Sequence, residues 1–161
     1  MVIAQTTHAS LRIELSAFAA AAYTATELMT QIAEKLNFSM LRYNWVGFYW
    51  IEKSPGAVDA LVLGPFAGTI DTYAEIPRGK GVCWAAVTSG ETILVSDVAT
   101  DPRYISRDGS AKSELVVPVF VHGSVAGILD VNSHFTDAFT HEDRQLCETA
   151  AEIVGRYISD H

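Results

Sequence analysis

Residues 113–132 read SELVVPVFVHGSVAGILDVN, two apolar and β-branched runs separated by a short polar turn. The turn, His122-Gly123-Ser124, lies between Ser113 to Val121 and Val125 to Asn132, which is the pattern of a β-hairpin. Pro118 cannot donate a hydrogen bond to a neighbouring strand, so it marks a bulge or a weak point in the first strand. The stretch indicates an antiparallel sheet in the middle of the molecule.

The chain before this hairpin contains further strand patterns. Aromatic and β-branched runs bounded by turn residues predict strands, in chain order, at residues 44–51, 59–66, 72–76 and 92–95. The first two runs are joined by Ser54-Pro55-Gly56, so we expect them to form another hairpin.

Helical patterns occupy both ends of the chain. Residues 9–38 contain no Gly or Pro and carry apolar residues at helical spacing, and Tyr23-Thr24 divides them into two helices. The last helix begins at Thr140, where Asp143 completes a capping-box pattern. A short helix is expected at residues 81–89, where an apolar run ends at a glycine.

The order of these elements predicts one α+β domain over residues 1–161. Its centre would be an antiparallel sheet, with the N-terminal and C-terminal helices on one face. The segment 67–112 would cover the other face and enclose a cavity for a small ligand.

Composition and charge exclude several classes of partner. The chain has 11 basic and 19 acidic residues and a net charge of −8, which disfavours binding to nucleic acid. No apolar run approaches the length of a membrane span, and the N-terminus lacks the pattern of a signal peptide. We therefore expect a cytoplasmic protein with no membrane partner, and its two cysteines are not expected to form a structural disulfide.

Cys83 is the candidate nucleophile. It follows Gly79-Lys80-Gly81-Val82, a glycine-rich turn that feeds the expected short helix. Backbone N–H groups and the helix dipole at such a position favour the thiolate. The alternative is an ordinary buried cysteine, the interpretation that also suits Cys147 in the C-terminal helix.

Two acidic residues lie in strands that are otherwise apolar. Glu114 and Asp130 either point to solvent or face the cavity, where they would bind an ammonium group or a similar donor. Trp45 and Tyr49 share a face of their strand and can form one wall of a pocket.

Five motifs, in the same order, resemble those of the free methionine-(R)-sulfoxide reductases, which are stand-alone GAF domains. The resemblance extends from about residue 10 to residue 158 and implies the GAF fold. The motifs are Asn44 to Tyr49, Leu61 to Gly68, Ile76 to Cys83, Ser113 to Pro118 and Gly127 to Ser133.

In that family three cysteines carry the redox chemistry, and this chain retains only the middle one, as Cys83. The position ten residues earlier is Tyr73, and the position seven residues before Glu114 is Arg107. The resemblance therefore implies an incomplete reductase, with Tyr73 and Arg107 in the ligand pocket. An arginine that faces the cavity would select an anionic ligand.

The resemblance also implies how a ligand is held. Glu114 and Asp130 match acidic residues that bind the amino group of the family's substrate. Asn132 replaces a second aspartate and can accept a hydrogen bond without carrying a charge. Trp45 and Tyr49 match the aromatic residues around the methyl–sulfur end of that substrate.

Three functions are compatible with these residues. The first is a binding module for a small polar, amino-acid-like ligand. The second is an active reductase in which Cys83 attacks free methionine-(R)-sulfoxide and an external dithiol recycles the thiol. The third is a thiol redox sensor. No metal or bound cofactor is expected, because the five histidines have no metal-ligand spacing, and a homodimer through the N-terminal helices is a further expectation.

Overall fold

The computed structural model describes residues 6–53, 55–70, 72–106 and 108–161, and the statements below concern these residues. The helices are α1 (His8–Ala21), α2 (Ala25–Ser39), α3 (Gly81–Ser89) and α4 (His141–Asp160), with a 3₁₀ turn at Val98–Thr100. The strands are β1 (Trp45–Glu52), β2 (Ala60–Gly68), β3 (Glu75–Pro77), β4 (Ile93–Val95), β5 (Ser113–Val121) and β6 (Ser124–Ser133).

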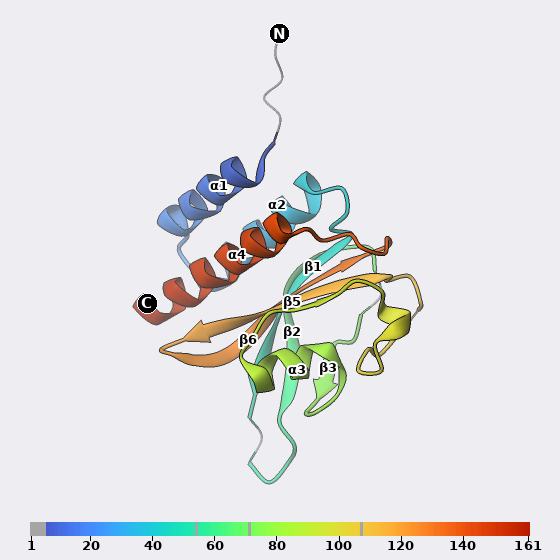
Figure 1. The fold of residues 1–161 in the computed structure, drawn as a ribbon. Coiled ribbons are helices and arrows are strands. Elements are labelled where there is room, and N and C mark those ends of the chain that lie inside the picture. Colours follow the sequence, from blue (N-terminus) through green and yellow to red (C-terminus); the bar gives the residue numbers. More distant parts are fainter. Residues whose placement is uncertain (1–5, 54, 71, 107) are drawn as a thin grey trace.

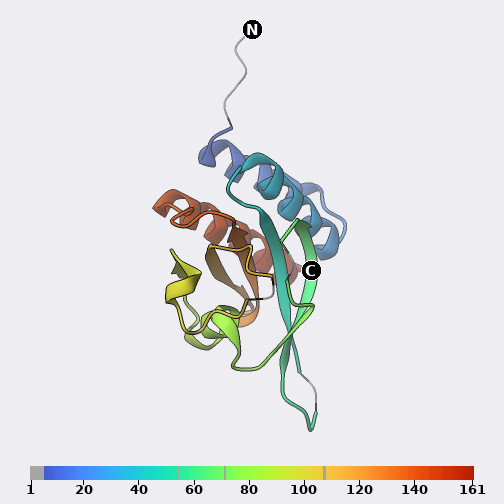
Figure 2. The ribbon, with the colours of Figure 1, turned by 90° about the vertical axis from the view of Figure 1, so that its right-hand side faces the viewer.

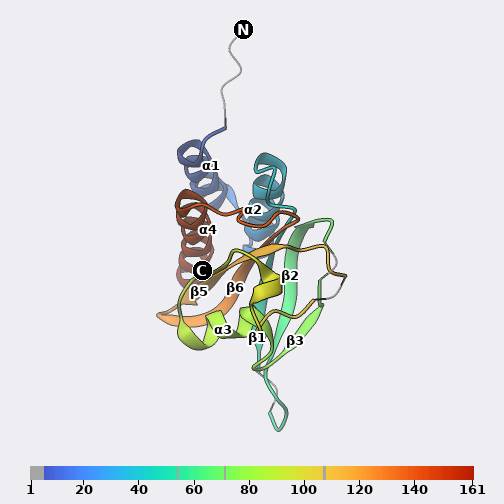
Figure 3. The same ribbon diagram turned by 45° about the vertical axis from the view of Figure 1, so that its right-hand side comes forward.

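The strands form one antiparallel sheet in the order β3-β2-β1-β6-β5-β4. Helices α1, α2 and α4 cover one face, and α3 lies against the other (Figures 1 and 3). Viewed along the sheet, the loops between β2 and β5 lie on the same side as α3 (Figure 2). The predicted α+β architecture is confirmed, and none of the described helices is long and apolar enough to cross a bilayer.

Two apolar cores lie on the two faces of the sheet. The larger joins the terminal helices to the sheet through fully buried side chains such as Leu15, Ile32 and Leu146. The smaller lies under α3 and contains Trp45, Tyr49 and Cys83 among others. The second core is where the sheet can present side chains to a ligand.

The caps of the terminal helices agree with the sequence patterns. The Thr24 hydroxyl accepts from the Glu27 N–H, as the Thr24…Glu27 spacing of a capping box predicts, although the Glu27 carboxylate accepts from the Tyr23 N–H and not from that of Thr24. The Thr140–Asp143 capping box is complete in both directions. Helices α2 and α4 thus begin where the sequence predicts.

Details of the strands differ from the predictions. The third strand is Glu75–Pro77 and not 72–76. The turn of the second hairpin is only His122-Gly123, and the bulge lies at Val119/Phe120. Pro118 pairs regularly with β6, and β4 contacts only residues 114–116, so Pro118 lies beyond that pairing and its missing N–H is tolerated.

Candidate functional site

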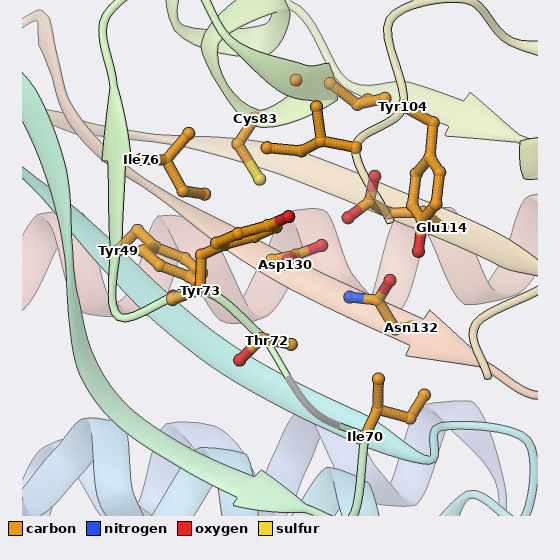
Figure 4. A pocket seen from close by; sticks show the side chains of 13 residues that line it. Tyr49, Ile70, Thr72, Tyr73, Ile76, Cys83, Tyr104, Glu114, Asp130 and Asn132 are labelled. Atoms are coloured by element: carbon orange, nitrogen blue, oxygen red, sulfur yellow. The ribbon is translucent and has the colours of Figure 1, made fainter. Parts of the chain in front are cut away.

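A cavity opens between the second face of the sheet, the start of α3 and the loops that flank it (Figure 4). It contains about 450 Å³ of empty space, its open mouth included. None of the thirteen described residues that line it is Lys, Arg or His. They are Tyr49, Ile70, Thr72, Tyr73, Ile76, Gly81, Val82, Cys83, Tyr104, Ile105, Glu114, Asp130 and Asn132.

The register of β5 and β6 places three polar side chains on the floor of this cavity. Glu114 pairs with Asn132, and Asp130 lies two residues before Asn132 on the same face of the sheet. All three are buried, with exposed fractions of 5% or less. The alternative that Glu114 and Asp130 point to solvent is therefore wrong.

Helix α3 brings Cys83 to the same place from above. Gly79 and Gly81 both have positive φ, +81° and +76°, which turns the chain into the helix in a conformation that other residues rarely adopt. Cys83 lies in the first turn, and its thiol points towards the sheet (Figure 4). Its sulfur and oxygens of Glu114 and Asp130 all lie within 4.8 Å of one another.

Burial dominates the protonation of this cluster. It raises the pKa of Asp130 to about 6. Burial, with the nearby Asp130 carboxylate, raises the pKa of Glu114 well above its usual range. Burial and their mutual repulsion therefore disfavour the state in which both carboxyl groups are ionised.

The thiol of Cys83 follows the same rule. Burial, followed by the charges of Asp130 and Glu114, raises its pKa well above that of a free cysteine. The thiolate expected at the helix N-terminus does not form, because the backbone hydrogen bond that lowers this pKa is outweighed by desolvation and by two acidic neighbours. Cys83 is a protonated thiol in the ligand-free protein.

Two polar atoms on the cavity floor have no hydrogen-bond partner among the described residues. They are Oδ1 of Asp130 and Nδ2 of Asn132, both on side chains that are 3% exposed. Buried polar groups are normally bonded, because an unmatched one costs free energy. An acceptor and a donor are thus left for a bound molecule.

Tyrosines form the sides of the cavity. The Tyr49 hydroxyl donates to the Tyr73 carbonyl oxygen at 2.6 Å, and the Tyr73 hydroxyl donates to the Ser106 carbonyl oxygen at 2.9 Å. These bonds connect β1, the segment before β3 and the loop before β5. Tyr104 also lines the cavity, a role that the sequence did not reveal because its loop shows no strand or helix period.

The two tryptophans near the site play supporting roles. Trp45 does not line the cavity; its ring packs against Tyr49 and Phe66 and occupies the space above Gly47. The Trp84 indole N–H donates to the Ile76 carbonyl oxygen at 2.8 Å and joins α3 to β3. Trp45 therefore packs behind Tyr49, which forms part of the cavity wall.

The remaining candidates fall into two groups. Arg107 lies outside the described residues. Cys147 is fully buried in the core on the opposite face of the sheet from Cys83, as its place in the last helix suggested.

The described residues offer one cluster with metal-ligand chemistry, Cys83 with Glu114 and Asp130, which the histidine spacing could not indicate.

Comparison with known proteins agrees with this architecture. A family model described as the GAF domain matches residues 24–158. Protein YtsP of Bacillus subtilis is 35% identical over 135 residues, covering 80% of each chain. The free methionine-R-sulfoxide reductase of Escherichia coli is 38% identical over 120 residues, or 71% of this chain and 69% of that protein.

A solved structure resembles almost the whole chain. The fRMsr of Staphylococcus aureus, in complex with its substrate, superposes with a TM-score of 0.84 and 31% identity, covering 98% of this chain and 99% of that one. The family model, the sequence relatives and this solved structure each match most of the chain. The chain therefore belongs to the GAF domain family and, within it, groups with the free methionine-R-sulfoxide reductases.

Proposed function

We propose that this chain is a binding protein for a free amino acid or a similar small zwitterion, and that it does not complete the reductase cycle by itself. The observation that carries the proposal is the buried pair Glu114–Asp130 on the cavity floor, with an unbonded oxygen on Asp130. A buried negative charge is costly unless a positive group compensates it. An ammonium group supplies both the charge and the missing donor.

The start of α3 complements the other end of such a ligand. Gly81 and Val82 line the cavity, and the helix begins without a side-chain cap at Lys80. The N–H groups of the first turn and the positive end of the helix dipole favour a carboxylate. The cavity thus offers an acidic floor and an anion-binding helix end, which matches the charges of an amino acid.

The rest of the lining favours a side chain that is largely apolar. Ile70, Ile76, Tyr49 and Tyr104 contribute aliphatic and aromatic surface. Relatives named free methionine-R-sulfoxide reductase, one of them solved with its substrate bound, support a ligand of the size of methionine sulfoxide. Methionine sulfoxide and methionine are therefore the first ligands to test.

The chemistry of the thiols argues against efficient turnover. Reducing a sulfoxide to a sulfide consumes two thiols and yields a disulfide and water, through a sulfenic acid on the attacking cysteine. Cys83 is protonated in the ligand-free protein, and Cys147 lies across the sheet from it. The second candidate, a reductase in which an external dithiol resolves Cys83, is favoured by the position of this thiol in the cavity and by the relatives named free methionine-R-sulfoxide reductase.

Two measurements on the same protein test the proposal. Calorimetric titrations would compare free methionine-(R)-sulfoxide, methionine and N-acetylmethionine, which lacks the ammonium group. We expect the free amino acids to bind and the acetylated one to fail, and equal binding of all three would refute the role of the acidic floor. Methionine release with excess dithiol, beside Cys83→Ser, tests turnover. Release that requires Cys83 would establish the reductase instead.

A further inference from the structure

The cluster of Cys83, Glu114 and Asp130 has a second chemical capacity. It offers one sulfur and two carboxylate oxygens within 4.8 Å of one another. The three side chains come from α3, β5 and β6, and each is at most 5% exposed. They differ from an acidic surface patch, since the fold brings together three buried ligand atoms from separate elements (Figure 4).

An independent observation points to a positive ligand at this place. Oδ1 of Asp130 accepts no hydrogen bond from the described residues, although Asp130 is only 3% exposed. The described lining contains no cationic side chain that could compensate the carboxylates. A metal ion would supply the missing positive charge, as an ammonium group would.

We propose that Cys83, Glu114 and Asp130 form a binding site for a thiophilic divalent metal ion of the Zn²⁺ class. The sulfur ligand favours Zn²⁺ and similar ions over Mg²⁺ and Ca²⁺, which take oxygen ligands only. Three protein ligands with one open position are also a common arrangement for zinc. The metal site goes beyond amino-acid binding and does not depend on it.

The geometry requires a modest contraction of the cluster. Zinc bonds of about 2.3 Å to sulfur and about 2.1 Å to oxygen place tetrahedral ligand atoms roughly 3.5 Å apart. The atoms of the cluster, now up to 4.8 Å apart, reach this spacing by an inward shift of about 1 Å, within the range of side-chain rotation. The open position faces the cavity, where water or a ligand completes the coordination.

Asn132 would orient the carboxylates when a metal is bound. Its amide lies on the same face, opposite Glu114 in the β5–β6 pairing, and its Nδ2 has no hydrogen-bond partner among the described residues. Hydrogen bonds from such a neighbour orient carboxylate ligands around a metal. Metal binding releases the thiol proton, and any proton that the two carboxyl groups hold, to the buffer, and no electron is transferred.

Cobalt(II) is the probe for this site, because a Co²⁺–thiolate bond gives a charge-transfer absorption band. The full chain would be stripped with chelator, transferred to chelator-free buffer without oxygen, and titrated with Co²⁺ and then with Zn²⁺. We expect a thiolate band that saturates at one Co²⁺ per chain and disappears when Zn²⁺ is added. Failure of the band to form at millimolar Co²⁺ would overturn the proposal.

Matched variants assign the band to its residues. Cys83→Ser should abolish it, whereas Cys147→Ser, which alters the cysteine on the other face of the sheet, should leave it intact. Asp130→Asn, which keeps the thiol, should weaken Co²⁺ binding at least about tenfold, and circular dichroism would show that each variant is folded. A band that survives Cys83→Ser, or an unchanged affinity in folded Asp130→Asn, would contradict the assignment.

The metal proposal and the amino-acid proposal can each be refuted without affecting the other. The calorimetric titrations with amino acids are run in chelator, so their outcome does not depend on a metal. The Co²⁺ titration contains no amino acid, so a failed ligand screen leaves it unaffected. If both sites exist, Zn²⁺ should weaken the binding of methionine sulfoxide, because both cations use the Glu114–Asp130 pair.

Discussion

Replacing Asp130 with asparagine should stabilise the ligand-free protein. Burial raises the pKa of Asp130 from 3.8 to about 6, a difference of roughly two units. Keeping this carboxylate ionised inside the protein therefore destabilises the fold at neutral pH, by an amount on the order of 1–3 kcal/mol because the protonation of Glu114 is linked to it. Asparagine has nearly the same shape and carries no charge. Since its amide is still buried and polar, we expect a net gain of about 1–3 kcal/mol.

The pH dependence gives the sign of the effect. Well below pH 3.8 the carboxyl is protonated in the folded and the unfolded chain, so its charge costs nothing there. Between about pH 4 and pH 6 the unfolded chain loses the proton first, and the folded wild type is progressively destabilised. The advantage of Asp130→Asn should therefore grow across this window and remain constant above it.

Urea unfolding followed by tryptophan fluorescence, in chelator at pH 4 and pH 7.5, measures both quantities. Asp137→Asn is the matched control, because Asp137 is exposed and its φ of +51° suits asparagine. The control should change stability little at either pH. An Asp130→Asn protein that is no more stable than wild type at pH 7.5, or equally stabilised at both pH values, would refute the electrostatic argument.

Three further predictions concern other parts of the fold. Gly81→Ala forces a residue with a Cβ to a φ of +76°. It should lower the free energy of urea unfolding by about 1–3 kcal/mol and weaken ligand binding measured by calorimetry. Unchanged values would exclude strain at this turn. Thr140→Ala removes the N-cap of α4 and should lower the unfolding free energy by about 1 kcal/mol without altering ligand affinity, since α4 lies on the other face of the sheet. Tyr49→Phe removes the donor to the Tyr73 carbonyl oxygen and should cost about 1–2 kcal/mol in thermal unfolding; a neutral result would show that water replaces the hydroxyl.

Local patterns were sufficient to predict most of the fold. The hairpin at 113–132, the break before Thr24 and the capping box at Thr140 each depend on neighbouring residues, and each forms as expected. The third strand was predicted to start three residues and to end one residue too early, because among the described residues it pairs with just three residues of β2. A short edge strand is defined by that pairing and carries little signal of its own.

The site was harder to predict because it depends on contacts between distant segments. The spacing of Glu114 and Asp130 did not show whether their side chains face the cavity or the solvent. Their burial under α3 shows that they face the cavity. The helix position of Cys83 left a thiolate nucleophile and an ordinary buried cysteine open, and burial, followed by the two carboxylates from β5 and β6, raises the pKa of its thiol. Tyr104 reaches the cavity from an irregular loop, and no sequence period marks such a position.

The affinity of Asp130→Asn for free methionine-(R)-sulfoxide tests the central claim most directly. The titration would be made by calorimetry at pH 7.5 in chelator, with wild type and Asp137→Asn beside it. The carboxylate should bind the ammonium group, so its loss should weaken binding roughly tenfold or more, in a protein that is more stable than wild type. Wild-type affinity in Asp130→Asn would show that the acidic floor of the cavity does not hold the ligand.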